Sequence, residues 1–549
     1  MVQIHTKEAA ITLSTENSSS RRSLTHLVGN GLGPPIIWIP ALLVAVAMLL
    51  PPVYLFLSVT KTGMDMLNIF RDPDTVGVIV NTVGLMIAVA IGSIFIALPV
   101  AWLTIKTDLP FRKMWSVLTI LPLVIPSYVG GFLVATALGP KGLLQNIMEP
   151  FGVDRLPEIY GFPGAFLTLT ILSFPYVLLP LRASLYKLDP SIEESSHALG
   201  MGAWSTFIKV TLPMLRPPMV IGGLIVALYT ISDFGAVSMM HYETFTWSIY
   251  VEYESAFDRI RAASLAIILV SIAAVLIYIE SRTRNLSRYY VSGSGSPRSI
   301  RRYRLNSWKW VSLLFCLFVV MISFIMPISV LMYWASRAVM TDNLISNLIY
   351  ITLNSVYSSL LAAFFATVCG IFIAIFAVRF PSKISALTER LSYVSFALPG
   401  IVVALALVYF GIHYARPIYQ TMIILVFSYV VLFLPLAVGP IRNSLLQVNP
   451  KMEEAARSLG KGNMKVMSSI TLPLISGGVF AGASLVFLLT MKELPATLIL
   501  GPLGFKTLAT YIWSAAEEAF LGYAALGSLI LILGAAVPMT WLTLRGERL

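Results

Sequence analysis

Twelve separate apolar stretches, each about as long as a membrane-spanning helix, constrain the fold of this chain more than any other feature of its sequence. A transmembrane helix needs about 20 mostly apolar residues, and only helices or closed barrels satisfy all backbone hydrogen bonds inside lipid. The alternation of apolar and polar residues that barrel strands require is absent from these stretches. The sequence therefore predicts an all-α polytopic membrane helix bundle with twelve transmembrane helices. The predicted spans are residues 36–60, 78–104, 115–138, 162–181, 218–239, 262–279, 310–333, 351–378, 391–412, 421–440, 477–500 and 522–544.

The composition agrees with a membrane location and excludes a soluble globular protein. Hydrophobic residues make up 57% of the chain and charged residues 12%, and the mean hydropathy is +0.83. A soluble globular chain is roughly 45–50% apolar and about 25% charged, so this chain has too few polar groups to cover a water-exposed surface. Cys316 and Cys369 both lie in apolar runs and the five histidines are scattered, so no disulfide scaffold or metal site is predicted.

The distribution of lysine and arginine predicts the orientation of the spans. If the N-terminus is cytoplasmic, the inner segments carry 28 of the 38 basic residues and the outer segments carry nine. The positive-inside rule favours this orientation, with both termini in the cytoplasm. The net charge of +12 is thus explained by orientation rather than by nucleic-acid binding. Arg21 and Arg22 precede an apolar run that is too long for an export signal, so we interpret them as part of a cytosolic tail.

An internal duplication divides the chain into two halves. A stretch rich in Ser, Gly and Arg separates six predicted spans from six, as expected of a flexible cytosolic linker. Residues 182–216 align without a gap on residues 442–476, and twelve of the 35 positions are identical. Because each half holds six spans, we expect a pseudo-two-fold axis along the membrane normal and a path between the halves. The predicted parts are a cytosolic tail (1–35), a first half (36–280), a linker (281–309) and a second half (310–545).

Both copies of the aligned loop lie on the predicted cytoplasmic side, and each contains a short helix. Asp189-Pro190 and Asn449-Pro450 are typical helix starts, and a glycine is expected just past each helix end. A helix of about ten residues is not stable alone in water, so each needs a groove in which to lie. Two such helices predict docking to a dimeric cytosolic partner; ordinary interfacial helices, duplicated with the gene, are the alternative. The predicted docking residues are Glu193, Glu194, Leu199, Gly200, Glu453, Glu454, Leu459 and Gly460.

The same loop carries a resemblance to a known family. Glu454, Gly460 and the I-x-L-P sequence at 470–473 have the spacing of the loop signature of ABC-importer permeases. The first repeat holds a looser copy, with Val210 in place of the isoleucine. The resemblance implies two tandem six-helix repeats of the type I ABC-importer fold in a bacterial inner membrane. Within that family the chain is most similar to the fused, two-half permeases of ferric-iron uptake. The stretches that carry this likeness are 125–131 (IPSYVGG), 232–236 (SDFGA) and 492–498 (KELPATL).

The chain has no ATP-binding loop of its own. The segment 501–507 comes nearest to G-x-x-x-x-G-K-[ST], but its spacing is wrong and it lies on the predicted outer side. We therefore expect no catalytic residue and no cofactor in this chain. The resemblance implies two copies of a cytosolic ABC ATPase, which would hold ATP and Mg²⁺, and an external solute-binding protein. It favours ferric iron as the cargo, with thiamine or another small solute as alternatives.

Three charged residues fall within predicted spans. Asp233, Lys492 and Glu493 lie near the outer ends of spans five and eleven, at related positions of the two halves. Charges inside a bilayer are costly and usually face protein or a wet cavity, so these side chains are predicted to line the substrate path. The alternative is that they lock helix packing. Pro126 and Pro399 are candidates for kinks in spans three and nine.

A secondary transporter and a membrane-embedded enzyme are the two alternative functional classes. A secondary transporter with twelve spans would need ion-coupling residues at mid-membrane and would have no use for paired cytosolic docking helices. A membrane-embedded enzyme would need a catalytic cluster such as H-E-x-x-H, which the sequence lacks. The paired loops favour the importer.

Overall fold

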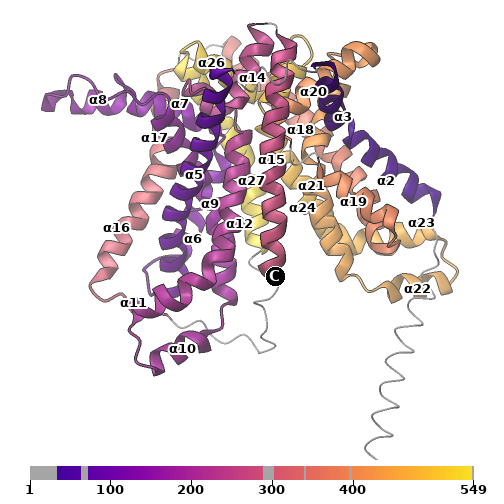
Figure 1. Cartoon of the computed structure of the whole chain (residues 1–549), viewed down its shortest axis with the longest axis horizontal. Coiled ribbons are helices and arrows are strands. Elements are labelled where there is room, and N and C mark those ends of the chain that lie inside the picture. The colour runs from indigo at the N-terminus through magenta and orange to yellow at the C-terminus, as the bar shows by residue number, and fades with distance from the viewer. Residues whose placement is uncertain are drawn as a thin grey trace, which may run out of the picture. The chain divides into compact units, whose positions relative to one another are not determined.

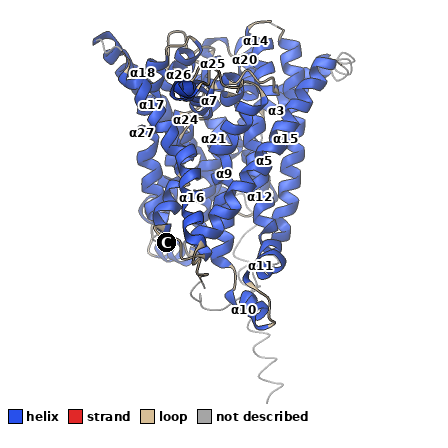
Figure 2. Ribbon diagram, turned by 90° about the vertical axis from the view of Figure 1, so that its left-hand side faces the viewer, coloured by secondary structure: helices blue, strands red, loops and turns tan. Residues whose placement is uncertain are grey.

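The computed structural model describes residues 34–62, 72–256, 258–287, 302–338, 342–394 and 398–546. Within these ranges the chain is helical (Figure 2), and the one strand-like feature is an isolated bridge between Thr107 and Tyr303. Nine helices of this described part are long and apolar enough to cross a membrane, which confirms the predicted class of fold. They are formed by α2 (Pro35–Met48) with α3 (Leu50–Thr62), α5 (Pro73–Lys106), α9 (Phe162–Lys187), α11 (Ala203–Thr206) with η3 (Phe207–Thr211) and α12 (Leu212–Ser232), α15 (Arg259–Ser287), α16 (Trp308–Val320) with η5 (Met321–Ile325) and α17 (Met326–Ser336), α18 (Asp342–Arg379), α21 (Met422–Gln447), and α23 (Asn463–Val466) with η8 (Met467–Thr471) and α24 (Leu472–Met491).

Two of the three remaining predicted spans do not form single long helices. Span 115–138 falls on two helical stretches, Arg112–Val124 and Ser127–Phe151, that meet at an angle of 98°. Span 391–412 begins in α19 (Lys383–Val394) and ends in the shorter apolar helix α20 (Gly400–Tyr414). Span 522–544 lies within α27 (Leu521–Gly546), of which Leu521–Ala536 is counted among the shorter apolar helices. The described helices therefore account for nine crossings, or ten if the bent pair is one span. The number twelve stays a prediction.

Proline accounts for the breaks in spans three and nine. Pro126 is extended, with ψ 151°, and directly precedes α7 (Ser127–Leu138); Pro399, with ψ 144°, directly precedes α20. Proline lacks an N–H, and it forces the residue before it out of the helical region. Pro126 therefore ends one helical stretch and starts another, whereas Pro399 marks the start of α20. The predicted kink in span three is a bend of 98° between two helical stretches.

Spans five and eleven are also broken, each just before its predicted outer end. In the first half α12 ends at Ser232, and the short helix α13 (Gly235–Met239) follows. In the second half α24 ends at Met491, and α25 (Pro495–Leu500) follows. The sequences at the two breaks, Asp233-Phe234 and 492–494, are the segments in which the intramembrane charges occur.

The chain packs as two compact units, which do not coincide with the two halves of the sequence. Unit 2 comprises Leu50–Ala362, Phe396–Leu432 and Phe487–Leu549. Its core lies where α5, α9 and α12 pack side by side around large buried side chains such as Phe174 and Leu178. A Cβ built on Gly222 of α12 would lie 2.7 Å from the Cα of Val177, so glycine allows these two helices to touch.

Unit 1 comprises Met1–Leu49, Ala363–Ser395 and Phe433–Val486. Small residues again allow close packing, because a Cβ on Gly482 would lie 3.0 Å from the Cα of Ala437. Helix α2, from the first half of the sequence, packs here on α19 (Lys383–Val394) of the second half. Conversely, α16 of the second half contributes Cys316 to a buried cluster with Leu103 of α5 in unit 2. The first helix of each half is thus packed on the other half.

The two aligned loops fold alike. In unit 2, α10 (Pro190–Ala198) leads through α11 and the π-helical turn η3 into α12. In unit 1, α22 (Pro450–Ser458) leads through α23 and the π-helical turn η8 into α24. Figure 1 shows α10 and α11 at the end of α12 that is remote from α7 and α14 (Phe245–Glu254). Each short helix is therefore connected to a long apolar helix through one further short helix and a π-helical turn.

Candidate functional site

Helices α10 and α22 begin where the sequence predicts, with the same capping geometry. The side chain of Asp189 accepts a hydrogen bond from the N–H of Ser191 at 3.0 Å, and that of Asn449 accepts one from Lys451 at 3.0 Å. Proline follows as the first helical residue in both, where its missing N–H costs nothing. These contacts satisfy exposed backbone donors at the helix start.

Both helices also end alike, at a left-handed glycine. Gly200 has φ +83° and Gly460 has φ +81°, a region in which residues with a Cβ are strained. A Cβ at either position would meet open space, so the requirement for glycine comes from the backbone alone. The N–H of the residue after each glycine bonds to a carbonyl in the helix, Met201 to Ser196 and Lys461 to Ala456. The predicted helix ends are confirmed.

The outward face of each helix is apolar at its end. The Leu199 and Leu459 side chains are each 83% exposed, and Ile192 and Met452 are exposed one to two turns earlier. Glu194 and Glu454 are exposed on the same helices. Exposed large apolar side chains at matching positions of two repeats are typical of a surface that binds another protein.

The inward face of α10 is held by a buried ion pair. The Nζ of Lys106, at the end of α5, lies 3.0 Å from Oε2 of Glu193, and both side chains are almost fully buried. The hydroxyl of Thr211, at the end of η3, donates to Oε1 of the same carboxylate at 3.0 Å. A buried charge is tolerated only when it is paired and its hydrogen bonds are satisfied. Helix α10 is thus tied to the two long helices α5 and α12.

Helix α22 is held in the same way by Glu453. Arg379, at the end of α18, donates to Oε1 of Glu453 through Nη2 at 2.9 Å and Nε at 3.1 Å. Thr471 of η8 donates to the same oxygen at 3.1 Å, and Arg457 of α22 itself lies 3.6 Å from Oε2. The two anchors therefore occupy equivalent positions in the repeats, although a lysine serves in one and an arginine in the other.

These contacts place two of the predicted docking residues away from the outward face, and docking itself stays a prediction. Glu193 and Glu453 are only 1% and 4% exposed and point into the chain, so they support their helices from behind and do not lie on the outward face. The other six predicted residues are on the outer surface of the two helices. Sequence reasoning missed the partners Lys106 and Arg379, although a signal existed: they fall at equivalent positions of the repeats, where each ends a long apolar run.

The three charges predicted to line a path lie at the helix breaks of unit 2. Oδ2 of Asp233 accepts a hydrogen bond from the N–H of Ala236 at 2.8 Å, at the start of α13. Oε1 of Glu493 accepts one from the N–H of Ala496 at 3.3 Å, at the start of α25. Lys492 donates from Nζ to the carbonyl of Leu123 at 3.1 Å, beside the bend in span three. All three charges therefore stabilise broken helix ends; their role in a path stays a prediction.

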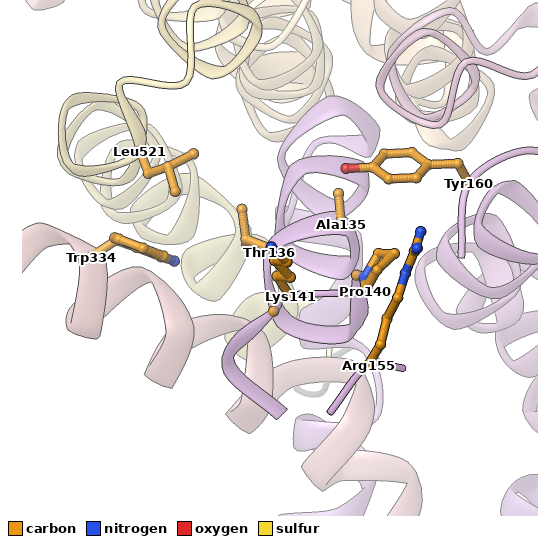
Figure 3. A pocket seen from close by; sticks show the side chains of 10 residues that line it. Ala135, Thr136, Pro140, Lys141, Arg155, Tyr160, Trp334 and Leu521 are labelled. Atoms are coloured by element: carbon orange, nitrogen blue, oxygen red, sulfur yellow. The ribbon is translucent and has the colours of Figure 1, made fainter. Parts of the chain in front are cut away.

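A cavity of about 500 Å³ lies elsewhere in unit 2 (Figure 3). It is lined by Thr136, Lys141, Arg155, Tyr160 and Trp334, among others. None of the three intramembrane charges lines it, so it is separate from the predicted path. Over the residues that the structure describes, no group of three or more His, Cys, Asp or Glu side chains is arranged to hold a metal ion.

Comparisons with known proteins agree on a transport family. The family model described as "Binding-protein-dependent transport system inner membrane component" matches residues 92–282 and again residues 366–547, which confirms the duplication. The Fe(3+)-transport system permease protein FbpB 2 of Haemophilus influenzae is 33% identical over 512 residues, covering 92% of this chain and 97% of the relative.

Two further relatives differ in coverage. The ferric transport system permease protein FbpB of Actinobacillus pleuropneumoniae is 25% identical, over 89% of this chain and 74% of the relative. The molybdenum transport system permease protein ModB of Escherichia coli is 26% identical and matches 97% of its own length, but only 40% of this chain. The likeness to the ferric permeases thus extends over both halves, whereas ModB corresponds to one.

Proposed function

The chain belongs to the binding-protein-dependent transport system inner membrane components, and from this premise we propose that it is the membrane-spanning permease of an ATP-driven importer for ferric iron. An external solute-binding protein would deliver the iron, and a separate cytosolic ATPase, in two copies, would drive its passage. The 33% identity to an iron permease along nearly the full length of both chains is the main support for the cargo. We propose twelve spans with both termini in the cytoplasm.

The observation that carries the role in energy coupling is the pair of anchored helices. Each presents an exposed leucine outward, Leu199 or Leu459, and a buried glutamate inward, Glu193 or Glu453. A groove in an ATPase subunit would cover the leucine. Movement of that groove would pass through the buried ion pair to α5 or α18, and through the threonine to α12 or α24. Because buried ion pairs resist separation, the helix and its anchors would move together.

This arrangement gives each part of the chain a mechanical role rather than a catalytic one. ATP and Mg²⁺ would be bound by the partner, and its closure would bring both coupling helices into motion. Rocking of the two repeats would then change access to the path between them. Asp233 and Glu493 are the carboxylates that we propose to place along that path, and oxygen ligands of this kind suit Fe³⁺.

The docking role is tested by changing the exposed leucines. Leu199→Asp together with Leu459→Asp should leave the permease in the membrane and abolish co-purification of the ATPase, because a charge would replace each apolar contact. Ile208→Asp is a matched control, since Ile208 is also exposed but lies in η3. Retention of the ATPase by the double variant would contradict the proposed docking.

The cargo and the energy source are tested by reconstitution. The permease, its ATPase and the binding protein in proteoliposomes should take up radioactive ferric iron in the presence of ATP, and vanadate should stop uptake. Competition with thiamine should have no effect. A secondary transporter would instead respond to a collapse of the ion gradient and would work without the ATPase.

A further inference from the structure

In the part of the linker that the structure describes, Tyr303 contacts the first coupling helix, α10. The backbone of Tyr303 pairs with the end of α5: its N–H donates to the carbonyl of Lys106 at 2.7 Å, and its carbonyl accepts from Asp108 at 3.2 Å. The next turn is fixed by Leu305, whose N–H donates to Oδ1 of Asp108 at 2.9 Å. This end of the linker is therefore a defined part of unit 2.

The side chain of Tyr303 reaches the anchor of α10. Its hydroxyl donates to Oε2 of Glu193 at 3.4 Å and lies 3.2 Å from Nε2 of His197 on the same helix. The ring stacks on Trp102 of α5, with centroids 6.0 Å apart, and meets the His197 ring edge to face at 6.0 Å. Tyr303 thus joins α5, α10 and the linker at a single point.

The carboxylate of the second coupling helix, α22, has a different third partner. The residue that aligns with His197 is Arg457, and its guanidinium lies 3.6 Å from Oε2 of Glu453, one helical turn back. In the second repeat, an arginine of α22 itself approaches Oε2 of the glutamate. In the first repeat, a tyrosine from the linker approaches the equivalent oxygen. The remaining contacts, a cation from a long helix and a threonine, are shared.

We propose that Tyr303 is a positioning residue for α10, so that the linker takes part in energy coupling at the first ATPase contact and is more than a tether. The proposal rests on the proposed function of the two helices. Tyr303 adds a third donor to a carboxylate that is only 1% exposed and already accepts from Lys106 and Thr211. It does not lie on the outward face that carries Leu199, so its loss should affect transmission rather than docking.

The test compares Tyr303→Phe with the double variant His197→Arg/Tyr303→Phe in the complex with its ATPase. Tyr303→Phe keeps the ring contacts and the backbone bridge and removes only the hydroxyl. Iron transported per ATP hydrolysed should fall about threefold, the small effect expected for loss of one long hydrogen bond of 3.4 Å to a carboxylate that keeps two other donors, while the amount of bound ATPase stays unchanged. The second substitution gives α10 the arginine that α22 already has, and the ratio should return to that of the unmodified protein.

Tyr186→Phe, on the exposed last turn of α9, is the matched control and should change nothing. An unchanged ratio in Tyr303→Phe would overturn the proposal, as would a lowered ratio that the arginine does not restore. Hydrogen exchange of the purified chain separates this outcome from a failure of the proposed function, because it needs no ATPase. Exchange over 190–198 should rise in Tyr303→Phe and fall again in the double variant, whereas 450–458 should stay unchanged; equal exchange in all three proteins would overturn the proposal.

Discussion

Helices α10 and α22 have the same length, the same cap and the same buried glutamate, yet the surroundings of the two carboxylates differ. Glu193 is paired with Lys106 in a site from which water is excluded, since the two side chains are 0% and 2% exposed. Glu453 is paired with Arg379, which is 14% exposed, and has the exposed Arg457 as a second cation. Duplication has kept the position of the anchor while its chemistry has changed.

This difference shows which feature the two sites have in common. Lysine offers a single charged point, and arginine offers a planar fork that binds one oxygen through two nitrogens. Either satisfies a carboxylate when a threonine and one further donor complete the site. The shared feature is therefore a carboxylate on the helix with a cation on the neighbouring long helix, and the identity of the cation is secondary. Four predictions test the comparison, in order of expected effect.

Removing the cation should lower the local stability of the first coupling helix more than that of the second. Lys106→Met leaves Glu193 buried without a charge partner and should cost about 3–5 kcal/mol of local stability. Arg379→Met should cost about 2 kcal/mol, because Arg457 and solvent still reach Glu453. Hydrogen exchange over 190–198 and 450–458 measures both losses.

A compensating variant separates the ion pair from general damage to packing. Lys106→Met/Glu193→Gln removes both charges and should recover most of the lost stability, since an uncharged pair avoids the cost of a buried lone carboxylate. Equal losses in the two repeats, or no recovery in the double variant, would show that the two anchors do not differ as described.

Changing the terminal glycines should affect both repeats equally. Gly200→Ala and Gly460→Ala each force a residue with a Cβ into the left-handed region. Each should lower the stability of its helix end by about 1–2 kcal/mol. Gly202 and Gly462 precede the next helices with φ −67° and −65° and open space around them, so alanine there is a matched control without effect. Uptake per ATP is the measurement, and a loss confined to one repeat would contradict the equivalence of the two helix ends.

Removing the threonine hydroxyls should have a smaller effect, again larger in the first repeat. Thr211→Val and Thr471→Val each delete one hydrogen bond to the anchoring carboxylate and should cost about 1 kcal/mol. The effect should be greater at Glu193, because water can reach Glu453 more easily through the exposed Arg457. Thermal unfolding of the purified variants tests the order; the reverse order would mean that exposure does not govern the anchors.

Cutting the linker should have the smallest effect. A protease site placed between Gly293 and Ser296 separates the two halves of the chain but leaves Tyr303 attached to the second half. Residues 303–305 should stay paired with Lys106 and Asp108, so uptake should match that of the uncut protein. Loss of uptake on cleavage would assign the linker the role of a tether and weaken the contrast between α10 and α22.

The starts and ends of the two short helices could be predicted from the sequence alone. The starts of α10 and α22 follow from Asp189-Pro190 and Asn449-Pro450, because capping depends on residues adjacent in the chain. Their ends follow from Gly200 and Gly460, for the same reason. Apolar length identified the long helices but does not register breaks, because a bend at one proline or charged residue leaves the apolar content of the segment unchanged. The break in span three was indicated by Pro126 alone.

The functional site divides in the same way. The sequence by itself determined that two equivalent short helices exist and that each is followed by a leucine and carries a pair of glutamates. Only the tertiary structure decided that Glu193 and Glu453 face inward, that Lys106, Arg379 and the threonines hold them, and that Tyr303 of the linker completes one of the two sites. The physical reason is distance along the chain: caps and turns form between neighbours, whereas a buried charge is satisfied by whichever donor the packing of remote helices brings within reach.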